Sequence, residues 1–311
     1  MERWPDLPYA AWKDTCTTLQ LWTQIVGKTR LALTPWLNHS WHVALNVTAR
    51  GLATPLISAQ SGDLQIEFDF VEHALVIRVS DGRVRTIVLE PMTVADFHAV
   101  FARSLDEFGL AVEIDGSPNE TIEAIPFAQD VTHGAYDGEF VNRFWRVLLR
   151  SHDVLSLFRT GFLGKASPVH FFWGSFDLAV TRFSGRRAPL HPGGIPHLPD
   201  AVVREAYSHE VSSAGFWPGG GPIDFAAYYS YAYPTPAGFG LAKVSPGEAF
   251  FSKELGEFVL PYDVVRCAAD PERTLFDFLE STYAAAADLG KWDRAELECA
   301  QGVIRRPRAI K

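Results

Sequence analysis

Val169-His-Phe-Phe-Trp-Gly-Ser-Phe-Asp-Leu-Ala-Val-Thr-Arg-Phe183 is a long, mostly apolar stretch in the second half of the chain. Its aromatic and β-branched residues predict a single strand over residues 169–183. Because alternate side chains of a strand share a face, we expect Trp173, Ser175 and Asp177 on one side of a sheet. A lone carboxylate among apolar neighbours is unfavourable, so Asp177 is expected to have a polar partner. The candidates are Arg182, Arg186 and His209.

Helical patterns stand on both sides of this predicted strand. Residues 139–160 carry apolar side chains at helical spacing, and residues 271–289 predict a closing helix that stops at Gly290. Between them, further strands are predicted at 205–213, 224–233, 248–252 and 256–260. The second half is therefore expected to run helix, antiparallel strands, helix.

The first half shows the same order of elements. A helix is predicted at 10–30, strands at 40–50, 64–70, 73–80 and 84–89, and a helix at 93–108 with Thr93 as its N-cap. Several identities support an internal duplication, at an offset of 133 positions and later of 181. The matching pairs include Trp12 and Trp145, Pro35 and Pro168, Leu45 and Leu178, Thr93 and Thr274, and Phe97 and Phe278.

These elements predict an α+β fold in which helices cover one face of antiparallel sheets. Residues 1–116 form a scaffold-like first half, 117–138 a linker, and 139–295 a second half. A loop rich in Gly, Pro and His is inserted at 186–221, and 296–311 form a basic tail. The halves are expected either to form two domains or to pair their sheets around a pseudo-twofold axis.

The composition argues against several classes of protein. The net charge of −9 argues against nucleic acid as a partner, and no apolar run is long enough to span a bilayer. The three cysteines, Cys16, Cys267 and Cys299, have neither the number nor the spacing of a disulfide framework. We therefore expect a cytoplasmic protein. The sequence does not determine its oligomeric state.

Two strings in the second half resemble a family of bacterial proteins known only as a domain of unknown function. They are His170-Phe-Phe-Trp-Gly-Ser-Phe-Asp-Leu178 and Tyr207-Ser-His-Glu-Val-Ser-Ser-Ala-Gly-Phe-Trp-Pro-Gly219. The amino-terminal Trp4-Pro-Asp-Leu-Pro8 is similar to the same family, so the resemblance covers nearly the whole chain. It implies one full-length unit and brings no catalytic residues with it.

Aromatic residues gather in the second half, where they predict a pocket for a small organic ligand. Arginines nearby are expected to anchor an anionic group, because a guanidinium binds carboxylate or phosphate with two hydrogen bonds. The predicted ligand-binding residues are Trp173, Arg182, Arg186, Arg204, Tyr207, Phe216, Trp217, Tyr229 and Tyr231.

Two alternatives remain open at this point. The first is a hydrolase-like enzyme that uses Asp177, His209 or Glu210 for acid–base chemistry, with or without a metal ion. A metal would be held by His170, His191, His197 and His209, although their spacing matches no established metal motif, and no other cofactor is predicted. The second is a protein–protein interaction module in which the loop and the aromatic residues form the interface.

Overall fold

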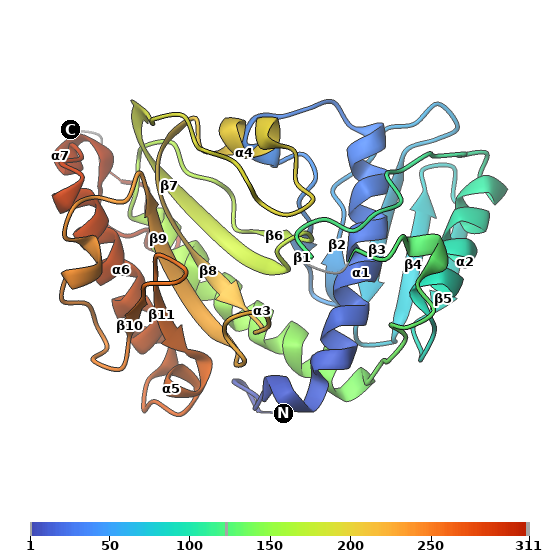
Figure 1. Cartoon of the computed structure of the whole chain (residues 1–311), viewed down its shortest axis with the longest axis horizontal. Helices are drawn as coiled ribbons and strands as arrows, with labels where there is room; N and C mark the ends of the chain where they lie inside the picture. Colours follow the sequence, from blue (N-terminus) through green and yellow to red (C-terminus); the bar gives the residue numbers. More distant parts are fainter. Residues whose placement is uncertain (1, 122–123, 309–311) are drawn as a thin grey trace.

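The computed structural model of the chain describes residues 2–121 and 124–308. Two antiparallel sheets lie side by side, each with long helices on one face (Figure 1). The predicted α+β class is therefore confirmed. Residues 122–123 of the predicted linker and 309–311 of the predicted basic tail lie outside the described residues.

The first sheet is a simple meander. Its strands, in the spatial order β1-β2-β3-β4-β5, are β1 (Asn46–Val47), β2 (Gly51–Ala53), β3 (Leu64–Asp69), β4 (Ala74–Val79) and β5 (Val84–Val88). Helices α1 (Tyr9–Leu33) and α2 (Val94–Glu107) pack on it through stacked rings. Phe97 of α2 stacks on Phe68 of β3, and Trp22 of α1 stacks on Phe97 with centroids 4.7 Å apart. Thr93 caps α2 as predicted, accepting a hydrogen bond from the Asp96 amide.

The second sheet has the spatial order β10-β11-β9-β8-β7-β6. Its strands are β6 (His170–Phe172), β7 (Asp177–Arg187), β8 (His209–Trp217), β9 (Ala227–Tyr233), β10 (Phe250–Ser252) and β11 (Glu257–Pro261). Helices α3 (Gly138–Thr160) and α6 (Pro271–Leu289) cover one of its faces. On that face Phe216 contacts Phe144 of α3, and the Tyr228 hydroxyl lies 2.8 Å from Ser151 Oγ.

Short helices complete the fold. They are the 3₁₀ turns η1 (Asn38–Ser40), η2 (Phe127–Gln129) and η3 (Phe239–Leu241), and the helices α4 (Asp200–Ala206), α5 (Tyr262–Arg266) and α7 (Arg294–Leu297).

The two halves join edge to edge and share one hydrophobic core. Leu45 and Phe171 exchange backbone hydrogen bonds of 2.8 Å, so the ends of the two sheets meet at β1 and β6. The 133-residue offset of the predicted duplication would make Leu45 equivalent to Leu178 of β7. In the structure Leu45 pairs instead with Phe171 of β6. The common element order is thus observed, whereas the duplication stays a prediction. Core side chains from both halves form one cluster.

The predicted strand over 169–183 is wrong, because the chain reverses within it. Residues 173–176 form a turn, in which Phe176 has a left-handed φ of 59°, and β6 and β7 pair as an antiparallel hairpin. Apolar composition is the same for one long strand and for a short hairpin, so the pattern could not separate them. The reversal brings Asp177 to the start of β7.

Two other strand predictions are wrong in part. Of residues 40–50 only Asn46–Val47 form a strand, because His39 and Ser40 adopt left-handed backbone angles and the chain turns there. The His39 amide donates to Glu205 and its ring bonds the Ala206 carbonyl, so contacts with α4 hold this turn. Residues 205–206 end α4, and β8 starts only at His209.

Candidate ligand pocket

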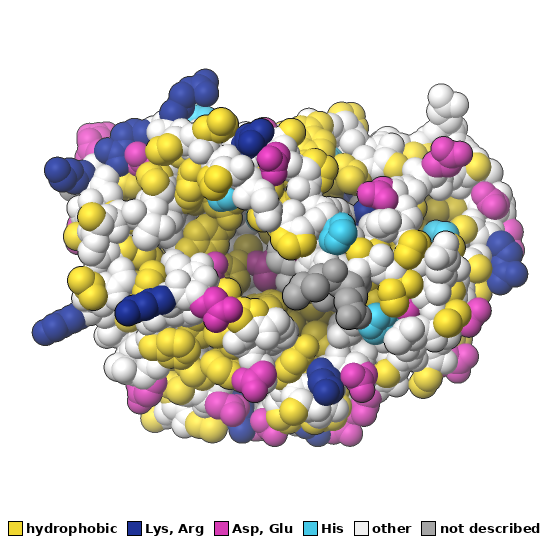
Figure 2. Space-filling view, viewed as in Figure 1, with side chains coloured by type: hydrophobic (Ala, Val, Ile, Leu, Met, Phe, Trp, Pro, Cys, Tyr) yellow, Lys and Arg dark blue, Asp and Glu magenta, His cyan; other side chains and the backbone are white. Residues whose placement is uncertain are grey.

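A cavity of about 980 Å³ lies on the face of the second sheet that α3 and α6 leave open. Its walls come from α1, from residues 115–121 after the first sheet, and from the loop and α4 between β7 and β8. Figure 2 shows this face of the molecule hollowed, with hydrophobic and acidic side chains at the opening. Both halves of the chain therefore build the pocket.

The floor of the pocket is one face of the sheet. The pairing of Thr181 with Ser213 and of Ser213 with Tyr231 places these side chains in one row across β7, β8 and β9. The Thr181 and Ser213 hydroxyls lie 2.9 Å apart. The next row runs from Ala179 through Gly215 to Tyr229.

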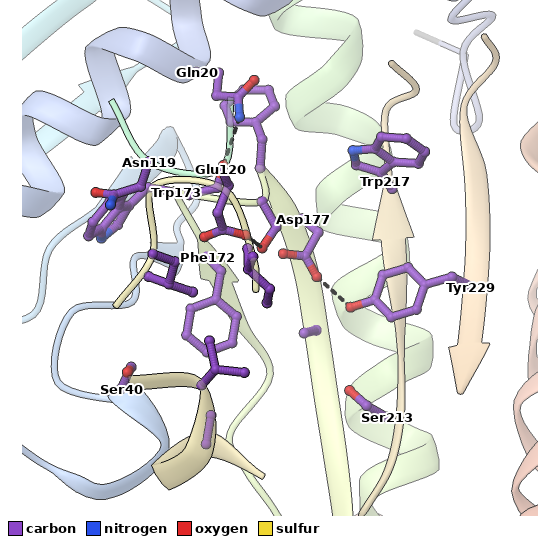
Figure 3. A pocket seen from close by; sticks show the side chains of 18 of the residues that line it. Gln20, Ser40, Asn119, Glu120, Phe172, Trp173, Asp177, Ser213, Trp217 and Tyr229 are labelled. Atoms are coloured by element: carbon purple, nitrogen blue, oxygen red, sulfur yellow. Dashed lines mark hydrogen bonds between the residues drawn. The ribbon is translucent and has the colours of Figure 1, made fainter. Parts of the chain in front are cut away.

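Gly215 lets Tyr229 lie flat across β8. A Cβ at Gly215 would stand 2.6 Å from the Tyr229 hydroxyl and 2.7 Å from its ring, and it would collide with the Leu178 carbonyl. Because this space is open, the Tyr229 hydroxyl reaches over β8 and donates a hydrogen bond to Asp177 Oδ2 on β7 (Figure 3). Asp177 thus has the polar partner that the sequence predicts, but the partner is a tyrosine.

Asp177 is the most buried carboxyl of the pocket, at 7% exposure. Tyr229 satisfies one oxygen, whereas Oδ1 makes no hydrogen bond with any described residue. Burial raises the pKa of Asp177 to about 7, the Tyr229 hydrogen bond opposes that rise, and the charge of Glu120 adds to it. The group is therefore poised between its neutral and charged forms at physiological pH.

Glu120 faces Asp177 from the segment that follows the first sheet (Figure 3). Its Oε2 accepts a 2.9 Å hydrogen bond from Ser175, and its backbone amide donates to the Pro196 carbonyl. Gly174 makes room for the carboxylate, since a Cβ there would collide with Oε1. Burial raises the pKa of Glu120. Sequence reasoning missed this residue because nothing in the predicted linker marks Glu120 as facing inward.

A third carboxyl, Glu257, lines the same cavity from β11. Burial and the charge of Asp177 raise its pKa to about 7. Beside it in the sheet, the Tyr231 hydroxyl lies 2.9 Å from that of Tyr207, whose pKa burial raises to about 12. No motif in the sequence singles out Glu257, although the period of a strand places it on the same face of β11 as Val259.

Positive charge is scarce among the described residues of the lining. They include four carboxyls, on Asp115, Glu120, Asp177 and Glu257, against a single lysine, Lys28. Lys28 is buried and forms an ion pair of 3.5 Å with Asp115. Burial lowers the pKa of His39, which also lines the cavity, and so favours its neutral form. The pocket is therefore acidic, with aromatic walls.

Five of the nine predicted ligand-binding residues line this pocket. They are Trp173, Tyr207, Trp217, Tyr229 and Tyr231. Phe216 does not, because its side chain lies on the opposite face, among Phe144, Tyr228 and Tyr262.

The three predicted arginine anchors also lie elsewhere, which corrects that expectation. Arg182 is buried beneath the sheet, where its guanidinium lies over the Phe158 ring and donates to the Phe158 carbonyl. Arg186 pairs with Glu210 and with the carbonyls of Gly290 and Lys291. Arg204 pairs with Asp200 on the surface. None of the three lines the pocket, and no other arginine stands among the described residues of its lining.

The other predicted catalytic residues do not join Asp177. Glu210 faces away from the pocket toward Arg186 and Ser184, and His209 lies near the His39 ring, outside the lining. Adjacent residues of a strand point to opposite faces, which separates this pair. An enzyme that combines Asp177, His209 and Glu210 in one site is therefore not what the geometry provides.

The predicted metal ligands are also apart from one another. His170 is buried on β6 against the Pro168 carbonyl, His191 stacks on Tyr207, and the His197 carbonyl accepts from Asn119. In the part of the chain that the structure describes, no group of three or more His, Cys, Asp or Glu side chains comes together as a metal site. Nor does any helix within it have the length and apolarity to cross a membrane.

The fold and the pocket define an α+β protein in which two antiparallel sheets meet at their edges and one of them carries an acidic, aromatic-walled cavity. The chain belongs to DUF5996, a family of unknown function whose model matches residues 4–299. This confirms the nearly full-length resemblance seen in the sequence. No curated protein and no solved structure matches the chain.

Proposed function

We propose that the protein binds a small organic cation, an amine that is protonated at neutral pH, in the pocket on the second sheet. The observation that carries the proposal is the Asp177 carboxyl, which is buried and lines the cavity with one oxygen unpaired among the described residues. A buried polar atom without a partner is unfavourable, and a ligand that donates a hydrogen bond relieves it.

The charge balance supports a cation. Glu120 and Glu257 line the cavity with Asp177, and none of the three forms an ion pair with a described lysine or arginine. Lys28, the cation of the lining, is held by Asp115. An ammonium ion would therefore find carboxylates whose charge no described lysine or arginine neutralises, whereas the same carboxylates would repel an anion.

The walls support an organic ligand. Trp217, Tyr229 and Tyr231 present ring surfaces to the cavity, and aromatic faces attract cations as well as methylene groups. A cavity of about 980 Å³ accommodates a molecule of metabolite size.

Calorimetric titration tests the proposal with three probes of one size: a primary alkylamine, the alcohol of the same length and the matching carboxylate. We expect the amine to bind most tightly. Asp177→Asn should weaken it by at least about tenfold, since hydrogen bonds to charged groups contribute about 1.5–3 kcal/mol. Glu210→Gln, on the other face of the same sheet, is the matched control and should bind like the wild type. Equal affinity for amine and carboxylate, or an unchanged Asp177→Asn variant, would overturn the proposal.

The affinity for the amine should rise with pH through about 7. Asp177, whose pKa burial raises to about 7, must lose its proton to pair with an ammonium. Glu120, which faces Asp177, shifts in the same direction. Binding near pH 6 should therefore release protons, which titrations in buffers of different ionisation enthalpy would detect.

A second candidate, acid–base catalysis at Asp177, is favoured by the same pKa of about 7, because such a group both accepts and donates protons near neutral pH. Its test is the hydrolysis of N-acyl derivatives of the amines, followed by NMR: water attacks the amide carbon, the carbon–nitrogen bond breaks, and the leaving amine takes the proton that the Asp177 carboxyl donates. Hydrolysis that disappears in Asp177→Asn supports catalysis. No hydrolysis of a derivative that is shown to bind argues for a binding protein.

A further inference from the structure

The acidic groups of the pocket lie at two ends of one aromatic floor. Asp177 precedes Leu178, which pairs with Phe216, and it therefore stands beside Trp217 on β8. Glu257 precedes Phe258, which pairs with Ser230, and it therefore stands beside Tyr231 on β9. Strands β7 and β11 are separated by β8 and β9. At about 4.8 Å per strand, the two strands lie roughly 14 Å apart. Because Tyr231 pairs with Ser213, the rows of Asp177 and Glu257 also lie four residues apart along β8, so the two ends face each other diagonally across the floor.

The surface between these two ends is formed mainly by aromatic rings. The rings of Tyr229 and Tyr231 stack along β9, with centroids 6.0 Å apart and planes at 19°. Gly215 contributes no side chain, so the Tyr229 ring lies over β8. The hydroxyl of each tyrosine is engaged, with Asp177 and with Tyr207 respectively. The middle of the floor therefore presents ring faces and suits methylene groups.

Each end has a carboxyl that can accept a further hydrogen bond or pair with a positive charge. At one end Asp177 Oδ1 has no hydrogen-bond partner among the described residues, and Glu120 faces the same group. At the other end Glu257 is half-buried and forms no ion pair with a described lysine or arginine. The carboxyls at the two ends interact electrostatically, since the charge of Asp177 raises the pKa of Glu257.

We propose that the ligand is a dication, an α,ω-diamine or a longer polyamine. One ammonium group binds Asp177 and Glu120, the other binds Glu257, and the methylene chain between them lies on Tyr229 and Tyr231. This inference rests on the proposed function and names the class of amine that the pocket selects. A single ammonium group would satisfy one end and leave the other acidic end unpaired.

The test compares monoamines with diamines of equal carbon number, from diaminopropane to diaminooctane, by calorimetric titration. We expect the best diamine to bind the wild type at least about tenfold more tightly than its monoamine, with an optimum at one chain length. Glu257→Gln should reduce the diamine to the affinity of the monoamine and leave the monoamine unchanged. Asp177→Asn should weaken both. Glu210→Gln, another partly buried glutamate of this sheet, should change neither, and urea unfolding checks that each variant is folded.

The two proposals fail in different ways. If monoamines bind through Asp177 but the second amino group adds nothing, or if Glu257→Gln weakens monoamine and diamine alike, the dication inference is overturned and organic-cation binding stands. If neither monoamines nor diamines bind, both proposals fall. A flat dependence on chain length also argues against two fixed ends.

Discussion

Replacing Asp177 with asparagine should change how the stability of the protein depends on pH. The substitution keeps the size of the side chain and an oxygen that accepts from Tyr229, but removes the titrating group. The pKa of Asp177 is about 7 in the folded protein, against an ordinary value of 3.8. The folded state therefore holds a proton between about pH 4 and 7 that the unfolded state releases.

The sign and size of the effect follow from this difference. The unfolded chain binds fewer protons in that range, so the free energy of unfolding of the wild type falls as pH rises from 4 to 7 and levels off above 7. A gap of roughly three pH units at about 1.4 kcal/mol each amounts to about 4 kcal/mol. Glu120, Glu257 and Tyr229 face Asp177, and the two glutamates contribute slopes of the same sign.

Urea unfolding at a series of pH values between 4 and 8 measures the effect. Subtracting the wild-type free energy from that of Asp177→Asn isolates the contribution of Asp177, and this difference should grow in favour of the variant by about 4 kcal/mol. Glu210→Gln, which removes a carboxyl outside the pocket, is the control. If the difference between Asp177→Asn and wild type changes by less than about 1 kcal/mol over this range, the burial argument for Asp177 is wrong.

Two further substitutions distinguish effects on amine binding from effects on the stability of the fold. Gly215→Ala should force Tyr229 off β8, with a loss of about 1–3 kcal/mol in unfolding free energy and a weaker affinity for amines, measured by urea unfolding and calorimetry. Unchanged amine binding in this variant would show that the hydrogen bond from Tyr229 to Asp177 is not needed for the site. Arg182→Ala should lower the melting temperature while amine affinity stays the same, because Arg182 is buried on the opposite face over the rings of Phe158 and Tyr283. A lost affinity in a folded Arg182→Ala protein would contradict this placement.

Much of the secondary structure could be predicted because its causes are local. The helices α1, α2, α3 and α6 follow from apolar periodicity, a capping threonine and terminal glycines, and their bounds agree with the predicted ranges within a few residues. Strands β3, β4 and β5 lie within the predicted ranges 64–70, 73–80 and 84–89. The shared face of Tyr229 and Tyr231 also depends only on the period of a strand.

What the sequence could not supply depends on contacts between distant segments. The hairpin turn at 173–176 has the same apolar composition as one long strand, and the Gln20 side chain of α1 donates a hydrogen bond to the Gly174 carbonyl in it. The end of helix α4 is held by His39, whose ring bonds the Ala206 carbonyl. The period of a strand places Arg182 and Asp177 on opposite faces, but only the packing of α3 and α6 decides that the Arg182 face is the covered one.

The acidic character of the pocket is likewise a property of the tertiary structure. The three carboxyls come from separate parts of the chain: Asp177 begins β7, Glu120 lies in the segment after α2, and Glu257 begins β11. Only folding places them around one cavity. By itself, the sequence determined the helices, most strands and the shared face of Tyr229 and Tyr231, because these follow from spacing along the chain. The tertiary structure decided the charge of the site, because the burial and mutual repulsion of its carboxyls exist only once the three are brought together.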